Sequence, residues 1–370
     1  MKILTITCHH AFNYGAMLQA YALSYYLRSF GHEVQVIDYA PYYLSGKVEV
    51  NFRWVPAQYN FWGLRQLYQI AKRKERTFDQ ERKNALERFY KVYIPATAER
   101  YKSIADLRSA SPKADMYIAG SDQIWNTRFP NGTDAAFYLD FGMPKRKISY
   151  AASFATQELV DGSQEFVSDK LRNFDAISVR ESSGLDILRE LGLSGTQVVD
   201  PVFLIDNNGW DFFDRDSSPR ERYILTYDFE KRHSVIAPIA KRLAHLQNCK
   251  IYSVSPFRLK YVDKSFPDAG PEEFVSLIKH AQCVISNSFH GSAFSMIYHK
   301  DFFVVNRRDG LNVRMSDLLG RYGLSDRIIT PSASDEDLMR AINYDNAVGM
   351  LNMDIKKSKD FLQSQINLAQ

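Results

Sequence analysis

Short apolar runs rich in β-forming residues alternate with helical stretches along nearly the whole chain. Residues 3–7 form the first run, a helical pattern at 16–30 follows and stops at Gly31, and residues 34–39 form the next run. Strands that alternate with helices in this way pair in parallel, with helices packed on both faces of the sheet. We therefore expect an α/β fold with parallel sheets.

The length of the chain indicates two lobes. Its 370 residues exceed one ordinary core and suit two domains of roughly 100–200 residues each. We predict an N-terminal Rossmann-like lobe at 1–205, a second at 206–334 and a helical tail at 335–370, with a linker at 207–222, where Asp, Asn, Ser and Pro crowd together. Further strands are expected at 114–119, 147–154 and 176–180, and then at 223–227, 250–253, 283–286 and 302–306.

Composition argues against several classes of protein. The 47 Lys and Arg residues exceed the 43 Asp and Glu residues by only four, so nucleic acid is not an expected partner. Cys8, Cys249 and Cys283 lie too far apart for a disulfide framework or a paired-cysteine metal site, which is typical of a reduced, cytoplasmic chain. The N-terminal run lacks the pattern of a signal peptide, and no run of about 18 apolar residues predicts a transmembrane segment.

Two further features of the sequence are assigned no binding or catalytic role. Residues 72–91 carry eight Lys or Arg and four acidic residues and are expected to form a long helix. Its basic excess could give peripheral membrane contact, although a solvated face is the favoured interpretation. The adjacent His9 and His10 are not expected to bind a metal, because neighbouring side chains diverge and the sequence places no third ligand.

Candidate binding residues follow the ends of the expected strands, because open parallel sheets bind ligands where strand ends meet helix N-termini. After the first strand, Asn13 and Gly15 can adopt the backbone geometry that exposes amides at a helix start. His9 in the same loop can carry a proton near neutral pH. A turn with an ordinary helix cap explains Asn13-Tyr14-Gly15 equally well.

Two more candidates follow the run at 114–119. Asp122 could act as a base or accept a hydrogen bond from a sugar hydroxyl, and Trp125 offers a flat apolar face to a pyranose ring. The alternative is that Ser121 and Asp122 are ordinary helix caps. Arg180 ends the run at 176–180 and offers a planar donor to a carboxylate or phosphate, unless it forms a structural ion pair with Glu181 or another acid.

The segment at 283–293 is the most informative of these loops. A strand runs into a turn of Ser, Asn, His and Gly that opens a helix, which places amides for an anion beside the titratable imidazole of His290. Downstream, Arg307 and Arg314 add cations on the same side. The chain has no Walker loop, dinucleotide fingerprint, serine hydrolase elbow or zinc protease helix, which argues against those functions.

Taken in order, five motifs resemble those of the polysaccharide pyruvyl transferase family. They are NYGAMLQAYAL at 13–23, GSDQIWN at 120–126, SVRE at 178–181, DPVFL at 200–204 and SFHG at 288–291, and the resemblance covers roughly residues 1–330. Members of this family are similar to GT-B glycosyltransferases, with two Rossmann-like lobes that face each other across a cleft. They transfer pyruvate from phosphoenolpyruvate to a sugar as a ketal, which implies a bacterial-type polysaccharide or its precursor as acceptor and no further cofactor.

The resemblance carries the family's Arg and His over to Arg180 and His290. Many members have Arg-Leu before His-Gly, where this chain has Ser288 and Phe289, so one cation beside the His is missing. Arg307 or Arg314 could replace it. Because phosphoenolpyruvate carries close to three negative charges, the expected donor-binding residues combine cations with the turn before the helix. They are Arg180, Ser288, Gly291, Ser292, Arg307 and Arg314.

A mechanism follows from this resemblance. His290, as imidazolium, protonates the methylene carbon of phosphoenolpyruvate while a sugar hydroxyl attacks C2, and Asp122 or His9 takes the hydroxyl proton. Asn13, Tyr14, Gly15 and Trp125 are expected on the acceptor side, and the acceptor could be lipid-linked. Alanine at His290 or Arg180 is expected to remove most turnover from a folded protein. Two alternatives stay open: a GT-B glycosyltransferase that uses a nucleotide sugar, and a non-catalytic carbohydrate-binding relative.

Overall fold

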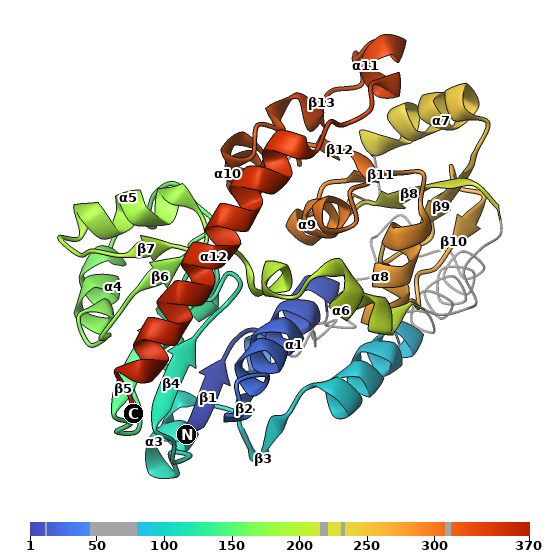
Figure 1. Cartoon of the computed structure of the whole chain (residues 1–370). Coiled ribbons are helices and arrows are strands. Elements are labelled where there is room, and N and C mark those ends of the chain that lie inside the picture. The colour runs from blue at the N-terminus through green and yellow to red at the C-terminus, as the bar shows by residue number, and fades with distance from the viewer. Residues whose placement is uncertain (12, 45–79, 215–220, 231–233, 308–311) are drawn as a thin grey trace, which may run out of the picture.

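Two parallel sheets organise the chain (Figure 1). The computed structural model describes residues 1–370 except residue 12 and residues 45–79, 215–220, 231–233 and 308–311. The first sheet has the order β3-β2-β1-β4-β5, and its strands are β1 (Lys2–Ile6), β2 (Glu33–Tyr39), β3 (Ala96–Tyr101), β4 (Met116–Ala119) and β5 (Arg146–Ser149). A short pair of parallel strands, β6 (Ser178–Val179) and β7 (Thr196–Gln197), lies next to β5 at the edge of this sheet and is connected to it by isolated bridges.

The second sheet has the order β10-β9-β8-β11-β12-β13. Its strands are β8 (Tyr223–Tyr227), β9 (Lys250–Ser253), β10 (Lys264–Ser265), β11 (Cys283–Ser286), β12 (Asp301–Val305) and β13 (Ile328–Ile329). In both sheets the strand order reverses beside the first strand of the sheet, between β1 and β4 and between β8 and β11. Open α/β sheets bind ligands at such reversal points, beyond the carboxyl ends of the strands.

Helices cover both sheets, and short 3-10 turns connect them. The longer helices are α1 (Tyr14–Arg28), α4 (Gln164–Leu171), α5 (Ser182–Glu190), α7 (Ile236–Gln247), α8 (Pro271–His280), α9 (Phe289–Ile297), α10 (Val313–Arg321) and α12 (Asp345–Asn367). The shorter ones are α3 (Ile104–Ser109), α6 (Asn207–Trp210) and α11 (Asp335–Met339). The 3-10 turns are η1 (Tyr42–Leu44), η3 (Pro130–Thr133), η4 (Ala135–Tyr138), η5 (Pro201–Leu204), η6 (Asp211–Phe213) and η7 (Ser325–Arg327).

Helix α1 forms because Asn13 caps its first turn and its apolar side chains are buried on nearly every side. The Asn13 side chain accepts a hydrogen bond from the backbone N–H of Ala16 at 2.7 Å, which satisfies one of the free amides at the helix start. The helix stops before Gly31, whose φ of +78° favours glycine. Its buried face belongs to an apolar cluster that also holds Phe274 of α8 and Phe294 of α9. One core therefore joins the two lobes.

The last helix connects the lobes a second time. Figure 1 shows α12, in red, running from the second sheet across to the edge of the first. Near its middle, Asp354 pairs with Arg321 of α10 at 2.6 Å. Farther along, Ser358 Oγ accepts a hydrogen bond from the Val199 N–H at 2.9 Å, and Gln365 accepts from the Arg146 guanidinium. Helix α12 thus packs against both lobes.

The structure differs from the sequence expectations in three places. Residues 207–222 are not simply a linker, because their first part folds into α6 and η6 and buries Trp210 and Phe213. The strand expected at 147–154 ends at Ser149, and the residues beyond it form bends. Of the basic segment at 72–91, residues 72–79 lie outside the described part of the chain, and the remainder is helical as part of a helix at 80–93.

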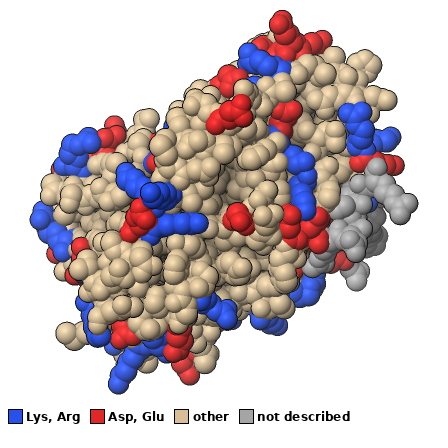
Figure 2. Space-filling model, viewed as in Figure 1, with Lys and Arg blue, Asp and Glu red and all other residues tan. Residues whose placement is uncertain are grey.

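Charge is dispersed over the face of the molecule that Figure 2 shows. Basic and acidic side chains are interspersed there, in agreement with the small formal net charge of +4. Among the described residues, no helix combines the length and apolar character needed to cross a membrane.

Candidate active site

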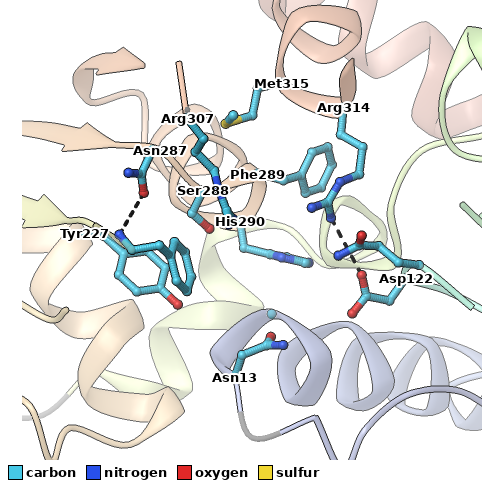
Figure 3. A pocket seen from close by; sticks show the side chains of 13 residues that line it. Asn13, Asp122, Tyr227, Asn287, Ser288, Phe289, His290, Arg307, Arg314 and Met315 are labelled. Atoms are coloured by element: carbon cyan, nitrogen blue, oxygen red, sulfur yellow. Dashed lines mark hydrogen bonds and ion pairs between the residues drawn. The ribbon is translucent and has the colours of Figure 1, made fainter. Parts of the chain in front are cut away.

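A pocket lies where the two lobes meet (Figure 3). The first lobe contributes the start of α1 and the loop after β4, and the second lobe contributes the loops after β8, β11 and β12 and the start of α10. The lining residues are Asn13, Gly15, Asp122, Gln123, Tyr227, Phe229, Asn287, Ser288, Phe289, His290, Arg307, Arg314 and Met315.

A buried glutamine holds the first-lobe wall in place. Gln19 of α1 donates to Thr7 Oγ1 at 2.9 Å and accepts from the Ser121 N–H at 3.1 Å. The Thr7 hydroxyl in turn donates to the Ser121 carbonyl at 2.8 Å. These bonds tie the loops after β1 and β4 together and fix the backbone that precedes Asp122. Asp122 itself has a φ of +72°, in the left-handed region that Asp tolerates better than most residues.

The second-lobe wall begins where β11 ends. Asn287 accepts a hydrogen bond from the Phe229 N–H at 3.0 Å and donates to Asp228 Oδ1 at 2.9 Å, which joins the loops after β8 and β11. Helix α9 then starts at Phe289, and the Ser288 side chain makes no capping bond to it. The first-turn amides of a helix have no partner within the helix, so this start favours an anion.

Behind these walls, buried charges from both lobes converge. Arg180 NH1 pairs with Asp200 Oδ2 at 2.6 Å, and its other nitrogens lie 3.7 Å from Glu181 Oε2 and 3.8 Å from Asp122 Oδ1. His290 Nε2 lies 3.7 Å from the same Asp200 Oδ2. The imidazole and the guanidinium, 110 positions apart in the chain, therefore share one carboxylate oxygen. Arg314 NH1 adds a second cation, 3.8 Å from Asp122 Oδ1.

Several of these buried groups lack hydrogen-bond partners within the described part of the chain. They include Nε and NH2 of Arg180, Oε2 of Glu181 and Nε2 of His290. Arg180 also stacks on Phe289, with its guanidinium carbon 4.3 Å from the ring centre. Because buried polar atoms are nearly always paired, the unpaired Nε2 of His290, a residue that lines the pocket, favours a ligand there.

Burial and neighbouring charges set the protonation states of the cluster. Burial lowers the pKa of His290 below its ordinary value, although Asp200 and Asp122 oppose this effect. Burial also lowers the pKa of Arg314 to about 10, with Arg180 adding to the shift. Burial alone would raise the pKa of Asp122, but Arg180, His290 and Arg314 bring it below the ordinary value. At neutral pH the cluster thus holds charged arginines, a charged Asp122 and a neutral imidazole.

The pocket unites many of the residues that the sequence singled out. Asn13, Gly15, Asp122, Ser288, His290, Arg307 and Arg314 all line it. Arg180 lies behind Phe289 and lines an adjoining cavity that shares Phe289 and Arg314 with the pocket. The alternative given above for Arg180, a structural ion pair, therefore matches its immediate contacts, which are with carboxylates.

Two aromatic residues expected to stack on a sugar are packed in the core instead. Trp125 is completely buried against Tyr138 and Phe154, and its indole N–H donates to the Phe137 carbonyl. Tyr14 is also completely buried and stacks on Phe274, with ring centres 4.7 Å apart. The expectation that these rings contact an acceptor was wrong, because each fills apolar space inside the protein.

Three more of the expected site residues lie outside the pocket lining. His9 is completely buried beside His10 and Asp38, so the expectation that it takes a substrate proton was wrong. Burial lowers its pKa to about 4. Gly291 packs against Ser286, and Ser292 is buried and donates to the Ser288 carbonyl. Both lie in the first turn of α9 and are not among the residues that line the pocket.

Other residues of the site were missed by sequence reasoning. Gln123, Asn287 and Phe289 lie within segments that the sequence analysis had singled out. Their position next to candidate site residues was the signal that could have identified them. Asp200 also lies in a marked motif, but nothing local shows that its carboxylate reaches both Arg180 and His290. Gln19 could have been found as a polar residue among the buried positions of an apolar helix.

Comparison with known proteins agrees with this architecture. A sequence model described as polysaccharide pyruvyl transferase matches residues 13–309, whereas no protein of curated function matches significantly. The glycosyltransferase SnogD from Streptomyces nogalater is 14% identical, with both chains covered completely and a TM-score of 0.50. UDP-GlcNAc 2-epimerase from Neisseria meningitidis, solved with UDP-GlcNAc, is 11% identical, with 99% of each chain covered and a TM-score of 0.52. At such identities the likeness shows the fold alone, and it confirms the expected two-lobed, GT-B-like α/β architecture.

Proposed function

Because the chain belongs to the polysaccharide pyruvyl transferase family, we propose that it transfers pyruvate from phosphoenolpyruvate to two hydroxyls of a sugar as a ketal. The observation that carries the proposal is the convergence of His290 and Arg180 on Asp200 behind a pocket that Arg307 and Arg314 line. A small trianionic donor needs several cations and a proton source in one place, and this pocket has both.

The charges of the site favour an anionic donor whose binding would raise the pKa of His290. Arg180 and Arg314 face the carboxylates of Asp122, Glu181 and Asp200, so the ions behind the wall largely neutralise one another. Arg307 and the start of α9 line the pocket and add positive potential that attracts the donor. A bound trianion would raise the pKa of the neutral His290, because nearby negative charge favours the imidazolium. The donor would therefore help to generate the acid that its own reaction needs.

The proposed reaction balances in atoms and charge. His290 Nε2 gives a proton to the methylene carbon, and one sugar hydroxyl attacks C2, so the double bond becomes a methyl group and a new C–O bond. The C2–O bond to phosphate then breaks, and a second hydroxyl attacks C2 to close the ketal. Of the two hydroxyl protons, one restores His290 and the other leaves with hydrogen phosphate. Asp122, a carboxylate at neutral pH, is the proposed acceptor of the attacking hydroxyl's proton.

The acceptor is proposed to enter from the first-lobe side. Asn13, Asp122 and Gln123 offer polar groups there, and Phe229 on the opposite wall is a partly exposed aromatic ring. Aromatic faces pack well on sugar rings, so Phe229 takes the stacking role first given to Trp125. A sugar of a polysaccharide or its precursor with two neighbouring free hydroxyls fits the family and the chemistry, and a lipid-linked form is included among the acceptors to be tested.

Phosphate release tests the proposal. The chain is incubated with phosphoenolpyruvate and a panel of sugars and lipid-linked sugars that carry diols, and free phosphate and the ketal product are measured. Phosphate and ketal that form only when an acceptor is present support the proposal. Glycosyl transfer from a nucleotide sugar without use of phosphoenolpyruvate would establish the GT-B alternative. Sugar binding without either reaction would favour the non-catalytic alternative.

Arg314 supplies a matched pair of variants for the donor. Its closest ion pair among the described residues is the 3.8 Å contact with Asp122, so the guanidinium retains donors for a ligand. Arg314→Met is expected to weaken binding of phosphoenolpyruvate about 10-fold or more, as measured by calorimetry. Arg189→Met, which removes an exposed arginine paired only locally with Asp186, is the control and should leave the affinity unchanged. Equal affinities for both variants would exclude Arg314 from the donor site.

Gly15 is expected to tolerate no side chain. A Cβ added at Gly15 would lie 1.9 Å from His290 Nδ1 and 2.5 Å from its Cγ, so Gly15→Ala must displace the ring. We expect phosphate release to fall about 10²-fold, since a misplacement of about 1 Å has that cost. Gly349→Ala is the control, because no atom lies within 4 Å of a Cβ there. Full activity of Gly15→Ala would mean that the ring position is not important.

The rate should depend on pH through His290. The reactive form is the imidazolium, whose fraction falls as the pH rises through the pKa of His290. Because burial lowers that pKa below 6.5, kcat/KM for phosphoenolpyruvate should fall steadily as pH rises above about 6.5. The decline in kcat should begin at higher pH, because bound donor raises the pKa. Initial rates of phosphate release between about pH 5 and 9 would show this. A kcat/KM that rises with pH above 6.5 would contradict the acid role.

A further inference from the structure

Two histidines and an aspartate meet outside the active-site pocket, at the carboxyl edge of the first sheet. His9 and His10 follow β1, and Asp38 lies near the end of the neighbouring strand β2. Their nearest nitrogen and oxygen atoms all lie within 4.8 Å of one another. The sequence placed no third ligand beside the histidine pair, and strand pairing supplies it.

Hydrogen bonding leaves one nitrogen of His9 without a partner. Its Nδ1 lies 3.1 Å from the Thr7 carbonyl oxygen, which can only accept, so Nδ1 carries the proton. Nε2 of the neutral ring is then an unprotonated acceptor. The His9 side chain is completely buried, and Nε2 has no hydrogen-bond partner among the described residues. This nitrogen lies 3.9 Å from Asp38 Oδ1, so two acceptors face each other in a buried site.

The carboxylate of Asp38 divides its two oxygens between different partners. Oδ2 accepts a hydrogen bond from Arg100 Nε at 2.7 Å, whereas Oδ1 lies 2.5 Å from His10 Nε2. Oδ1 therefore faces both imidazoles. The ring of Tyr90 stacks on His9, with centres 5.7 Å apart and planes 6° from parallel, and covers one side of the cluster. His10 is 12% exposed and leaves a route to solvent.

We propose that His9 Nε2, His10 Nε2 and Asp38 Oδ1 bind one divalent transition-metal ion of the zinc type. Two imidazole nitrogens and one carboxylate oxygen suit Zn²⁺, whereas Ca²⁺ and Mg²⁺ prefer oxygen ligands throughout. The bond from His9 to the Thr7 carbonyl is the outer contact that orients a metal-binding histidine and directs its other nitrogen at the ion. Water completes the coordination from the exposed side of His10.

Binding requires small movements of these side chains. Tetrahedral ligands about 2.0–2.1 Å from zinc are about 3.3 Å apart, so the 2.5 Å contact widens and the 3.9 Å contact shortens. Arg100, whose side chain is 52% exposed, balances Asp38 when no ion is bound. Its bond to Oδ2 leaves Oδ1 for the ion and orients the carboxylate.

The ion would organise the loop between β1 and α1. Asn13, at the end of this loop, caps α1 and lines the active-site pocket. The site would therefore hold the entrance to the pocket in shape without touching the reacting atoms. This inference concerns a separate cluster, so it stands whether or not the chain transfers pyruvate.

Cobalt binding tests the site. The full chain is produced without a histidine tag, treated with chelator and titrated with Co²⁺, whose visible absorption reports imidazole ligands. We expect one Co²⁺ per chain, displaced by one Zn²⁺. His10→Gln and Asp38→Asn should each weaken binding by about 10²-fold or more. The control is His280→Gln, which breaks another His–Asp contact, that of His280 Nε2 with Asp214 at 2.8 Å, and should leave binding unchanged.

The wild-type chain alone can also decide the question if a variant fails to fold. X-ray absorption of the zinc-loaded protein should show nitrogen and oxygen neighbours at about 2.0–2.1 Å and outer scattering from two imidazoles. Failure of the wild-type chain to bind Co²⁺ at one equivalent would overturn the proposal. So would sulfur neighbours at about 2.3 Å, or binding that folded His10→Gln and Asp38→Asn variants retain in full.

Discussion

His290→Ala is expected to release phosphate from phosphoenolpyruvate about 10²–10⁴-fold more slowly than the wild-type chain in the presence of acceptor. The variant lacks the group proposed to protonate the methylene carbon, whereas it keeps Arg307, Arg314 and the start of α9, which are proposed to bind the donor. The loss should therefore appear in kcat, with a smaller change in the affinity for phosphoenolpyruvate measured by calorimetry.

The control for His290→Ala is His280→Ala. His280 contacts Asp214 at the end of α8, outside the pocket lining, so its removal should leave turnover near the wild-type value. Circular dichroism and urea unfolding establish that both variants are folded. Undiminished turnover in a folded His290→Ala variant would exclude the imidazole as the acid.

Arg180→Ala is expected to lower the free energy of unfolding by about 3–5 kcal/mol, because it leaves buried carboxylates without their cation. Asp200, Glu181 and Asp122 all lie within 4 Å of the guanidinium, and the Arg180 side chain is only 3% exposed. From the sequence alone we expected this variant to lose turnover while staying folded. The buried contacts of Arg180 predict in addition a large loss of stability. Urea unfolding of the variant and the wild-type chain measures the difference.

Arg189→Ala is the matched control for Arg180→Ala. Its side chain is 76% exposed and pairs with Asp186 on the same helix, so the change in unfolding free energy should stay within about 0.5 kcal/mol. Arg180→Lys, which keeps a charge beside Asp200, should recover part of the lost stability. If Arg180→Ala unfolds like the wild-type chain and loses only affinity for phosphoenolpyruvate, Arg180 is a ligand of the donor and not a support of the wall.

The sequence predicted those parts of the site that depend on position along a strand. Asp122 follows a buried strand of the first sheet and His290 follows one of the second, and open parallel sheets bind ligands beyond the carboxyl ends of their strands. Gly15 was recognised as a position of unusual backbone freedom, yet its actual constraint is the close approach of His290 from the other lobe. Contacts of this kind depend on how the two lobes pack against each other, which no local sequence pattern predicts.

Aromatic residues show where sequence reasoning failed. Trp125 stands beside Asp122 in the chain, but its side chain turns into the core, where its N–H finds a backbone acceptor. Tyr14 lies next to Gly15 and is enclosed by the core that joins the lobes. Phe229, which does line the pocket, belongs to no marked motif. Which side of a loop faces a ligand is decided by packing, and an apolar ring suits either environment.

Contacts with residues of a neighbouring strand or of the other lobe could not be predicted from the sequence either. Asp38 reaches the histidine pair only because β2 lies beside β1 in the sheet, and Asp200 reaches His290 only because the lobes meet. Pairwise chemistry of this kind decides whether a histidine is a ligand, an acid or a packing residue.

A crystal structure with phosphoenolpyruvate would show whether the donor binds beside His290. We expect the carboxylate and phosphate to contact Arg307, Arg314 and the first turn of α9, with the methylene carbon facing His290 Nε2. Phosphoenolpyruvate bound at a place without His290, or a pocket left without it at saturating concentration, would contradict the account.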